Sequence, residues 1–231
     1  MDLVWSGSRQ ALALLAGADR EIWGILWLSL QVSGAATVIA LGLGVPTGAA
    51  LALARFPGRG LVVSAVNTGM GLPPVVVGLF VTLLLWRSGP FGDLEILYTP
   101  AAIVVAQAVI AAPIVTGITL AAVGQVPREF RLQLLGLGAS RAQMVWLVLR
   151  EARLPMLAAV MAGFGGIISE IGASMMVGGN IKGQTRTLTT AMVLETGKGN
   201  FEIAIALALL LLVLIFLVNW LLTAIQQRHT R

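Results

Sequence analysis

The chain alternates between long apolar runs and shorter polar intervals. An α-helix needs roughly 20 apolar residues to cross a bilayer, and five runs meet that length: residues 22–54, 61–86, 100–123, 155–177 and 201–225. The first run exceeds one crossing, so we expect its helix to tilt, to kink at Pro46 or to project from the membrane. The pattern predicts one all-α polytopic membrane domain over residues 1–231, with five transmembrane helices.

The composition supports this membrane assignment. Of 231 residues, 58% are hydrophobic and 11% are charged, against about 25% charged in a soluble domain, which excludes a soluble globular protein. We assign the net charge of +5 to topology and to anionic lipid headgroups rather than to nucleic acid. Residues 1–21 mix apolar and polar positions, which suits an interfacial segment leading into the first span.

The distribution of Lys and Arg predicts the orientation in the membrane. With the C-terminal tail inside, the inner segments carry nine of these cations and the outer segments carry six. We therefore expect residues 126–155 and the C-terminus in the cytoplasm. The N-terminus and a loop over residues 178–200 are expected outside.

Two features inside the apolar runs indicate a translocation pathway. Pro73 and Pro74 interrupt the second run and free backbone carbonyls, which is tolerated where the break faces other helices or a water-filled path. Glu170 is the one ionisable residue of the fourth run, with Gly172 close by, and an ionisable group within a span is a functional candidate. Three roles stay open for Glu170: a partner for an arginine or for backbone donors, a protonated gate residue, or a helix-packing hydrogen bond.

The polar interval over residues 126–155 is too long for a simple connection. Pro127 can start a helix over 128–135, glycines allow a bend, and Ser140 with Gln143 matches a capping box that begins a second helix, which runs to Arg153. We interpret it as a docking platform for another protein, and an amphipathic connector resting on lipid headgroups is the alternative. The predicted docking residues are Arg128, Glu129, Arg131, Leu135, Gly138, Ala139, Ser140 and Arg141.

Several motifs resemble a known transporter family. The platform resembles the cytoplasmic coupling loop of ABC importer permeases, called the EAA loop, through Leu137-Gly138-Ala139-Ser140 and the later Leu154-Pro155. It departs from that motif at residues 132–134, where Leu-Gln-Leu replaces the acidic residue and two alanines, and the interval to Leu-Pro is longer. Residues 71–78, 170–173, 179–181 and 185–188 resemble permeases for molybdate, tungstate and sulfate. Residues 149–153 and 194–199 look most like the tungstate branch.

The resemblance implies the type I ABC importer permease fold in a prokaryotic cell (inner) membrane. It also implies a homodimer, with ABC ATPase subunits on the cytoplasmic platform and an external solute-binding protein. The chain has no G-x-x-x-x-G-K-[ST] motif, so we expect ATP and Mg to bind the partner ATPase. We expect no cofactor, metal or catalysis in this chain. The expected substrate is tungstate, with molybdate or sulfate as alternatives.

A polar cluster marks the expected substrate mouth, consisting of Asn180, Thr185, Arg186 and Thr187. One cation among neutral donors would attract a dianion without trapping it. The alternative is that Arg186 pairs with Glu195 or only holds the loop. An ion-coupled secondary transporter is the competing function, but it would need intramembrane carboxylates, and only Glu170 qualifies.

Overall fold

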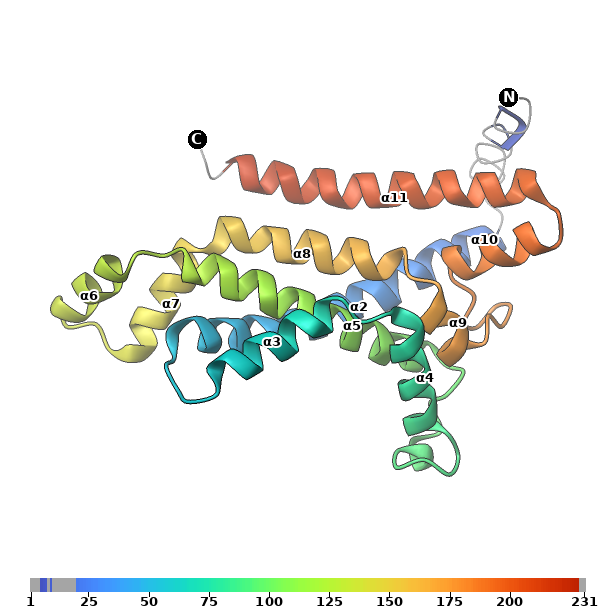
Figure 1. The fold of residues 1–231 in the computed structure, drawn as a ribbon. Helices are drawn as coiled ribbons and strands as arrows, with labels where there is room; N and C mark the ends of the chain where they lie inside the picture. Colours follow the sequence, from blue (N-terminus) through green and yellow to red (C-terminus); the bar gives the residue numbers. More distant parts are fainter. Residues whose placement is uncertain (1–4, 8, 10–19, 229–231) are drawn as a thin grey trace.

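The computed structural model describes residues 5–7, 9 and 20–228. These residues form α-helices and one 3-10 turn, without any strand among them, which confirms the all-α prediction (Figure 1). Most of the predicted interfacial segment over residues 1–21 lies outside the described residues. Three helices are long and apolar enough to cross a membrane, and the number reaches five when each of two bent helix pairs is taken as one span.

The three long helices are α2 (Arg20–Leu53), α5 (Pro100–Gly124) and α11 (Phe201–Arg228). Pro46 lies inside α2, which continues as one helix to its end. Its 34 residues correspond to about 51 Å of helix at about 1.5 Å per residue. Because a bilayer core is about 30 Å thick, α2 extends beyond the core unless it tilts strongly.

The second apolar run forms a bent pair, as its prolines predict. Helix α3 (Arg59–Met70) and helix α4 (Pro74–Leu85) meet at an angle of 101°. Pro73 is the N-cap of α4 and Pro74 is its first residue, where a missing amide hydrogen removes no helical hydrogen bond. Figure 1 shows α4 standing out from the rest of the bundle.

The fourth apolar run also forms a bent helix pair, a break that the sequence analysis did not predict. Helix α8 (Arg153–Ile168) and the short helix α9 (Gly172–Gly178) are bent by 59° at the intervening break. Helix α8 also begins two residues before Pro155, which therefore lies in the first turn, where proline is tolerated. The break lies at Glu170, whose carboxylate accepts from the amides of Ala173 and Ser174 in the first turn of α9.

The polar interval over residues 178–200 is not a loop throughout. Helix α10 (Leu188–Gly197) occupies half of it and pairs with α11 as a hairpin (Figure 1). Its apolar face, with Leu188 and Ala191, packs into a cluster shared with α2, α8 and α11. The connection between α4 and α5 contains a 3-10 turn, η1 (Gly92–Leu94).

The core depends on close backbone approach between α2 and α5. A Cβ atom built on Gly48 would lie 2.5 Å from the carbonyl oxygen of Thr116, and one on Gly44 would lie 2.7 Å from Val115. Fully buried alanines such as Ala36 and Ala106 line the same contact. Small residues allow this approach, which lets van der Waals contacts hold membrane helices together.

The predicted platform is present as two short helices, α6 (Arg128–Gly136) and α7 (Arg141–Glu151). Their bounds agree with the predicted helices within one or two residues. Figure 1 places α6 and α7 at one end of the bundle and α9 and α10 at the other. The two groups of candidate residues that the sequence indicates therefore lie at opposite ends of the protein.

Candidate functional site

The bend of the platform is built by local hydrogen bonds. Gly138 has φ +86°, a conformation that glycine adopts without strain. The amide of Gly138 donates to the carbonyl of Leu135, and the amide of Ala139 donates to that of Leu134, which is the Schellman ending of a helix. The predicted capping box follows, since the Ser140 amide donates to Gln143 Oε1 over 2.8 Å and the Gln143 amide donates to Ser140 Oγ over 3.3 Å.

One side of the platform is fixed to the bundle. Val148 of α7 is fully buried in a cluster with Val123 and Val126 at the end of α5 and with Ala49 of α2. Only Ala152 separates α7 from α8. Three residues, 125–127, separate α5 from α6, so both connections between the platform and the bundle are short.

The other side of the platform is open. Leu132, Leu135, Leu137 and Trp146 are exposed, and Leu137 reaches 86% exposure. Among the predicted docking residues, the exposed ones are Arg128, Glu129, Leu135, Gly138, Ser140 and Arg141. The predicted docking set omitted Leu132, Leu137 and Trp146. Large apolar residues within a polar segment are a sequence signal for a protein interface that the prediction did not use.

Two of the predicted docking residues are less open. Ala139 is half-buried. Arg131 is half-buried as well and turns back toward the start of its own helix, where its Nη2 donates to the carbonyl of Val126 over 3.5 Å. Its Nε is buried without a partner among the described residues. The docking role of the whole set stays a prediction.

Glu170 occupies the break between α8 and α9. Its carboxylate accepts hydrogen bonds from the amide of Ala173 (2.8 Å), the amide of Ser174 (3.1 Å) and the Ser174 hydroxyl (3.2 Å). The residue is 7% exposed. Of the three roles considered, this geometry matches the partner for backbone donors. A carboxylate at the start of a helix satisfies free amides and favours the helix dipole.

The carbonyl side of the same break is also satisfied. Gln107 of α5 donates from Nε2 to the carbonyl of Ile167 over 3.1 Å, and its Oε1 accepts from the Ser33 hydroxyl of α2. The hydroxyl of Thr189 donates to the carbonyl of Glu170 over 3.1 Å. Sequence reasoning missed Gln107, although an amide within an apolar span was a signal.

The two broken spans pack directly on each other. A Cβ atom on Gly172 would lie 2.5 Å from Val75 Cγ2, and one on Gly78 would lie 2.6 Å from the Cα of Ala173. The structure thus brings Gly172 and Glu170 beside α4, which begins at Pro73 and Pro74. Pro73 is exposed and Pro74 is half-buried. Their role in a pathway stays a prediction.

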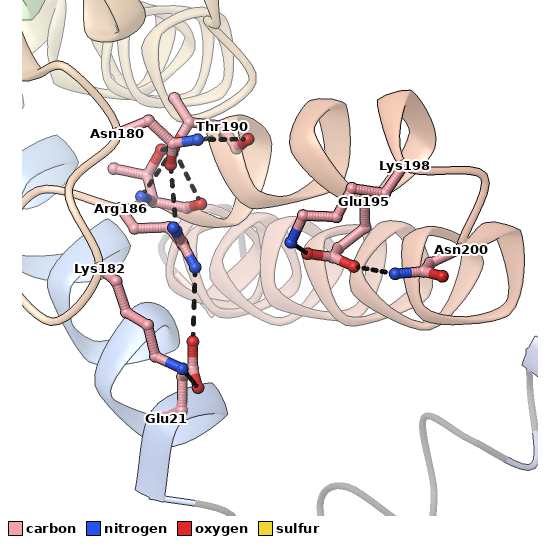
Figure 2. A network of polar contacts seen from close by, with 9 residues as sticks. Glu21, Asn180, Lys182, Arg186, Thr190, Glu195, Lys198 and Asn200 are labelled. Atoms are coloured by element: carbon pink, nitrogen blue, oxygen red, sulfur yellow. Dashed lines mark hydrogen bonds and ion pairs between the residues drawn. The ribbon is translucent and has the colours of Figure 1, made fainter.

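Two of the expected mouth residues, Asn180 and Arg186, belong to a polar network with Lys182 and Glu21 (Figure 2). Asn180 accepts from Arg186 Nε over 3.3 Å and donates to the carbonyl of Thr190. Arg186 Nη1 and Lys182 Nζ lie 3.5 and 2.6 Å from the two carboxylate oxygens of Glu21, on α2. The network joins the start of the first span to the segment after α9.

Thr185 and Thr187 are buried. The Thr185 hydroxyl donates to the carbonyl of Gly178 over 2.6 Å and accepts from the amide of Ile181. Thr187 caps α10 through a capping box. Both hydroxyls are engaged within the chain, so in this conformation they hold the segment, and contact with an anion stays a prediction.

The sequence analysis gave an ion pair between Arg186 and Glu195 as an alternative, but in the structure each of these residues has other hydrogen-bond partners. The Glu195 carboxylate instead accepts hydrogen bonds from Lys198 Nζ and from the side-chain amide of Asn200, each over 2.7 Å. These hydrogen bonds, that of Asn200 first, hold the pKa of Glu195 below its usual value, although partial burial opposes them. The described residues contain no group of His, Asp and Glu that could hold a metal ion.

Comparison with known proteins agrees with this architecture. A probable anion ABC transporter permease protein of Haloferax volcanii is 43% identical over 180 residues, covering 76% of this chain and 78% of that protein. The tungstate uptake system permease protein TupB of Peptoclostridium acidaminophilum is 36% identical over 229 residues, covering 98% of this chain and all of that protein.

The fold has a solved counterpart. A chain of the MetNI methionine ABC transporter, solved in inward-facing conformations, superposes with a TM-score of 0.74 at 21% identity, covering 92% of this chain and 95% of that one. This likeness confirms the predicted permease fold. Residues 44–231 match the family described as the binding-protein-dependent transport system inner membrane component, and the chain belongs to that family.

Proposed function

We propose that this chain is the membrane permease of an ATP-driven importer for a tetrahedral oxyanion, tungstate. One structural observation carries the permease role: a platform fixed to α5 and α8 lies at one end of a bundle whose other end contains two broken spans in direct contact. Such discontinuous helices are typical of transport pathways. The tungstate assignment comes from the relative that shares nearly the whole length of the chain.

Membership of this family implies a separate ATPase and a binding protein as partners. We propose that the ATPase, which binds ATP and Mg, docks on the open side of α6 and α7. Leu135 and Leu137 would fill a groove of the partner, and Arg128 and Arg141 would contact its rim. Buried apolar anchors surrounded by a polar rim are typical of protein interfaces. ATP-driven movement of the platform would then shift α8 and the break at Glu170.

We propose further that two copies form the pathway. Helix α3 has no buried residue. Helix α4 stands out from the bundle and exposes four large apolar side chains, those of Val75, Leu79, Phe80 and Leu83. A second copy would cover this surface. Because the chain has no cysteine, Phe80→Cys gives a single thiol for cross-linking. A bis-maleimide should yield a dimer with F80C and none with F216C on α11, and the reverse result would place the interface elsewhere.

The proposed orientation has the N-terminus outside and the C-terminus in the cytoplasm, following the Lys and Arg distribution. Single cysteines at Lys182 and Ser140 test it. In intact cells an impermeant thiol reagent should label K182C and not S140C. Labelling of S140C alone would invert the orientation.

Reconstitution with the cognate ATPase and binding protein tests the function. Tungstate should stimulate ATP hydrolysis and uptake more than molybdate or sulfate does. Equal responses would remove the tungstate assignment and leave an oxyanion permease of broader range. Ion-coupled transport is a weaker candidate, because the Glu170 carboxylate is occupied by three hydrogen bonds.

A further inference from the structure

A cavity beside the first turns of α2 shares Arg186 with the expected substrate mouth and extends from it along the first span. Its volume is about 510 Å³, and it lies between α2 and the segment that follows α9. Three cations line it, Arg20, Lys182 and Arg186, against one acid, Glu21. The charged groups of the lining therefore sum to a net charge of +2, which favours an anionic ligand.

The cations differ in how firmly they are held. The Arg186 side chain is 16% exposed and is held between Asn180 and Glu21, whereas the Lys182 side chain is 68% exposed and pairs with Glu21 (Figure 2). Exposed ion pairs contribute little to stability, so Lys182 can turn to another anion with little loss. A guanidinium and an ammonium together are a common arrangement for a phosphate group.

Most of the remaining wall is formed by the membrane-spanning helix α2 and is apolar, with Gln31 of α2 and Gln184 as further polar residues. Ile25 and Leu28 lie along it, with Trp27 on the rim at 61% exposure. Open space lies next to Gly24 in the cavity wall, because a Cβ atom built on this residue would meet nothing within 4 Å. A tryptophan at this height is typical of the interface between headgroups and hydrocarbon.

We propose that this cavity binds an anionic phospholipid. Its phosphate would contact Lys182, Arg186 and Arg20, and an acyl chain would follow the open groove at Gly24 and Leu28 along α2. A free oxyanion shares the phosphate chemistry but makes no use of Ile25, Trp27 and Leu28, which favours the lipid. This proposal requires only that α2 lies in a bilayer, so it does not depend on which solute the protein carries.

Native mass spectrometry of the purified protein tests the proposal, with phosphatidylglycerol or phosphatidylcholine as the added lipid. We expect tighter retention of phosphatidylglycerol. Each lost cation should weaken it about fivefold, so the double variant R20Q/K182Q should bind on the order of 25-fold more weakly. The matched control is K198Q, which removes a lysine that forms a similar ion pair with Glu195 outside this cavity, and it should bind as the wild type does.

A second pair of variants tests the groove without changing charge. Gly24→Leu fills open space and favours the helix, so it should fold and yet exclude the lipid. Gly42→Leu makes the same change on α2 outside this cavity and should retain the lipid. Equal retention of both lipids by the wild type, or undiminished binding by R20Q/K182Q or G24L, would overturn the proposal. Displacement of phosphatidylglycerol by sodium tungstate or sodium phosphate would also overturn it and assign the cations to a free anion.

Discussion

Replacing Glu170 by glutamine tests whether its carboxylate holds the break in the fourth span. The two side chains have nearly the same shape, so the change leaves no cavity. The amide oxygen can still accept from Ala173, but the amide nitrogen then faces the backbone donor of Ser174. One charge-assisted hydrogen bond becomes neutral, the buried amide of Ser174 loses its acceptor, and the Ser174 hydroxyl must accept instead of donate.

The magnitude follows from these contacts. Hydrogen bonds to charged groups contribute about 1.5–3 kcal/mol, neutral ones about 1 kcal/mol, and a buried unsatisfied donor costs about 1–3 kcal/mol. E170Q should therefore lose about 2–4 kcal/mol of stability. Ser174→Ala removes only the hydroxyl donor and should lose about 1 kcal/mol.

Denaturant unfolding of the purified protein in mixed micelles measures the stability of both variants. Transport by the reconstituted complex should fall with E170Q, because α9 loses the fixed start that places it against α4. A stability of E170Q within about 0.5 kcal/mol of the wild type, a typical value for surface substitutions, would refute the cap. A loss from S174A larger than that from E170Q would refute the assignment of the backbone amides as main donors.

Three further predictions concern other parts of the molecule. Gly48→Ala should cost about 1–3 kcal/mol in the same unfolding assay, because its Cβ would lie 2.5 Å from a backbone oxygen, whereas Gly42→Ala, which meets open space, should be neutral or stabilising; equal effects would contradict the close packing. Leu137→Ser, at an 86% exposed position, should leave unfolding unchanged and weaken ATPase copurification about tenfold, and unchanged copurification would argue against docking there. Because its partners lower the pKa of Glu195 from 4.5, their stabilisation is present above pH 4.5 and is lost as the pH falls through the folded-state value. Hydrogen exchange of α10 should show this loss in the wild type and not in E195Q.

The sequence predicted the elements whose signals are local. The platform is an example, since Ser140 and Gln143 form a capping box three residues apart and Gly138 adopts the conformation that the bend requires. The break at Pro73 and Pro74 was equally readable, because proline removes a donor and ends a helix.

The remaining features depend on contacts between distant residues. The sequence left three roles open for Glu170 and did not predict the helix break beside it, where Gln107 and Thr189 satisfy freed carbonyls. Arg186 pairs with Glu21, which lies 165 positions earlier, and no spacing rule indicates such a partner. Helix α10 was missed because its short sequence lies in an interval that was assigned as a loop, and its apolar residues are stabilised by packing against α11 and α2.

The central claim is that a membrane pore without its own energy source is driven through the platform formed by α6 and α7. Uptake of tungstate into proteoliposomes tests it most directly, with ATP and the cognate ATPase and binding protein either present or omitted in turn. We predict uptake only when all components are present, and its loss when Leu137 is replaced by serine. Uptake at full rate by the permease alone, without any ATP-hydrolysing subunit, would contradict the account.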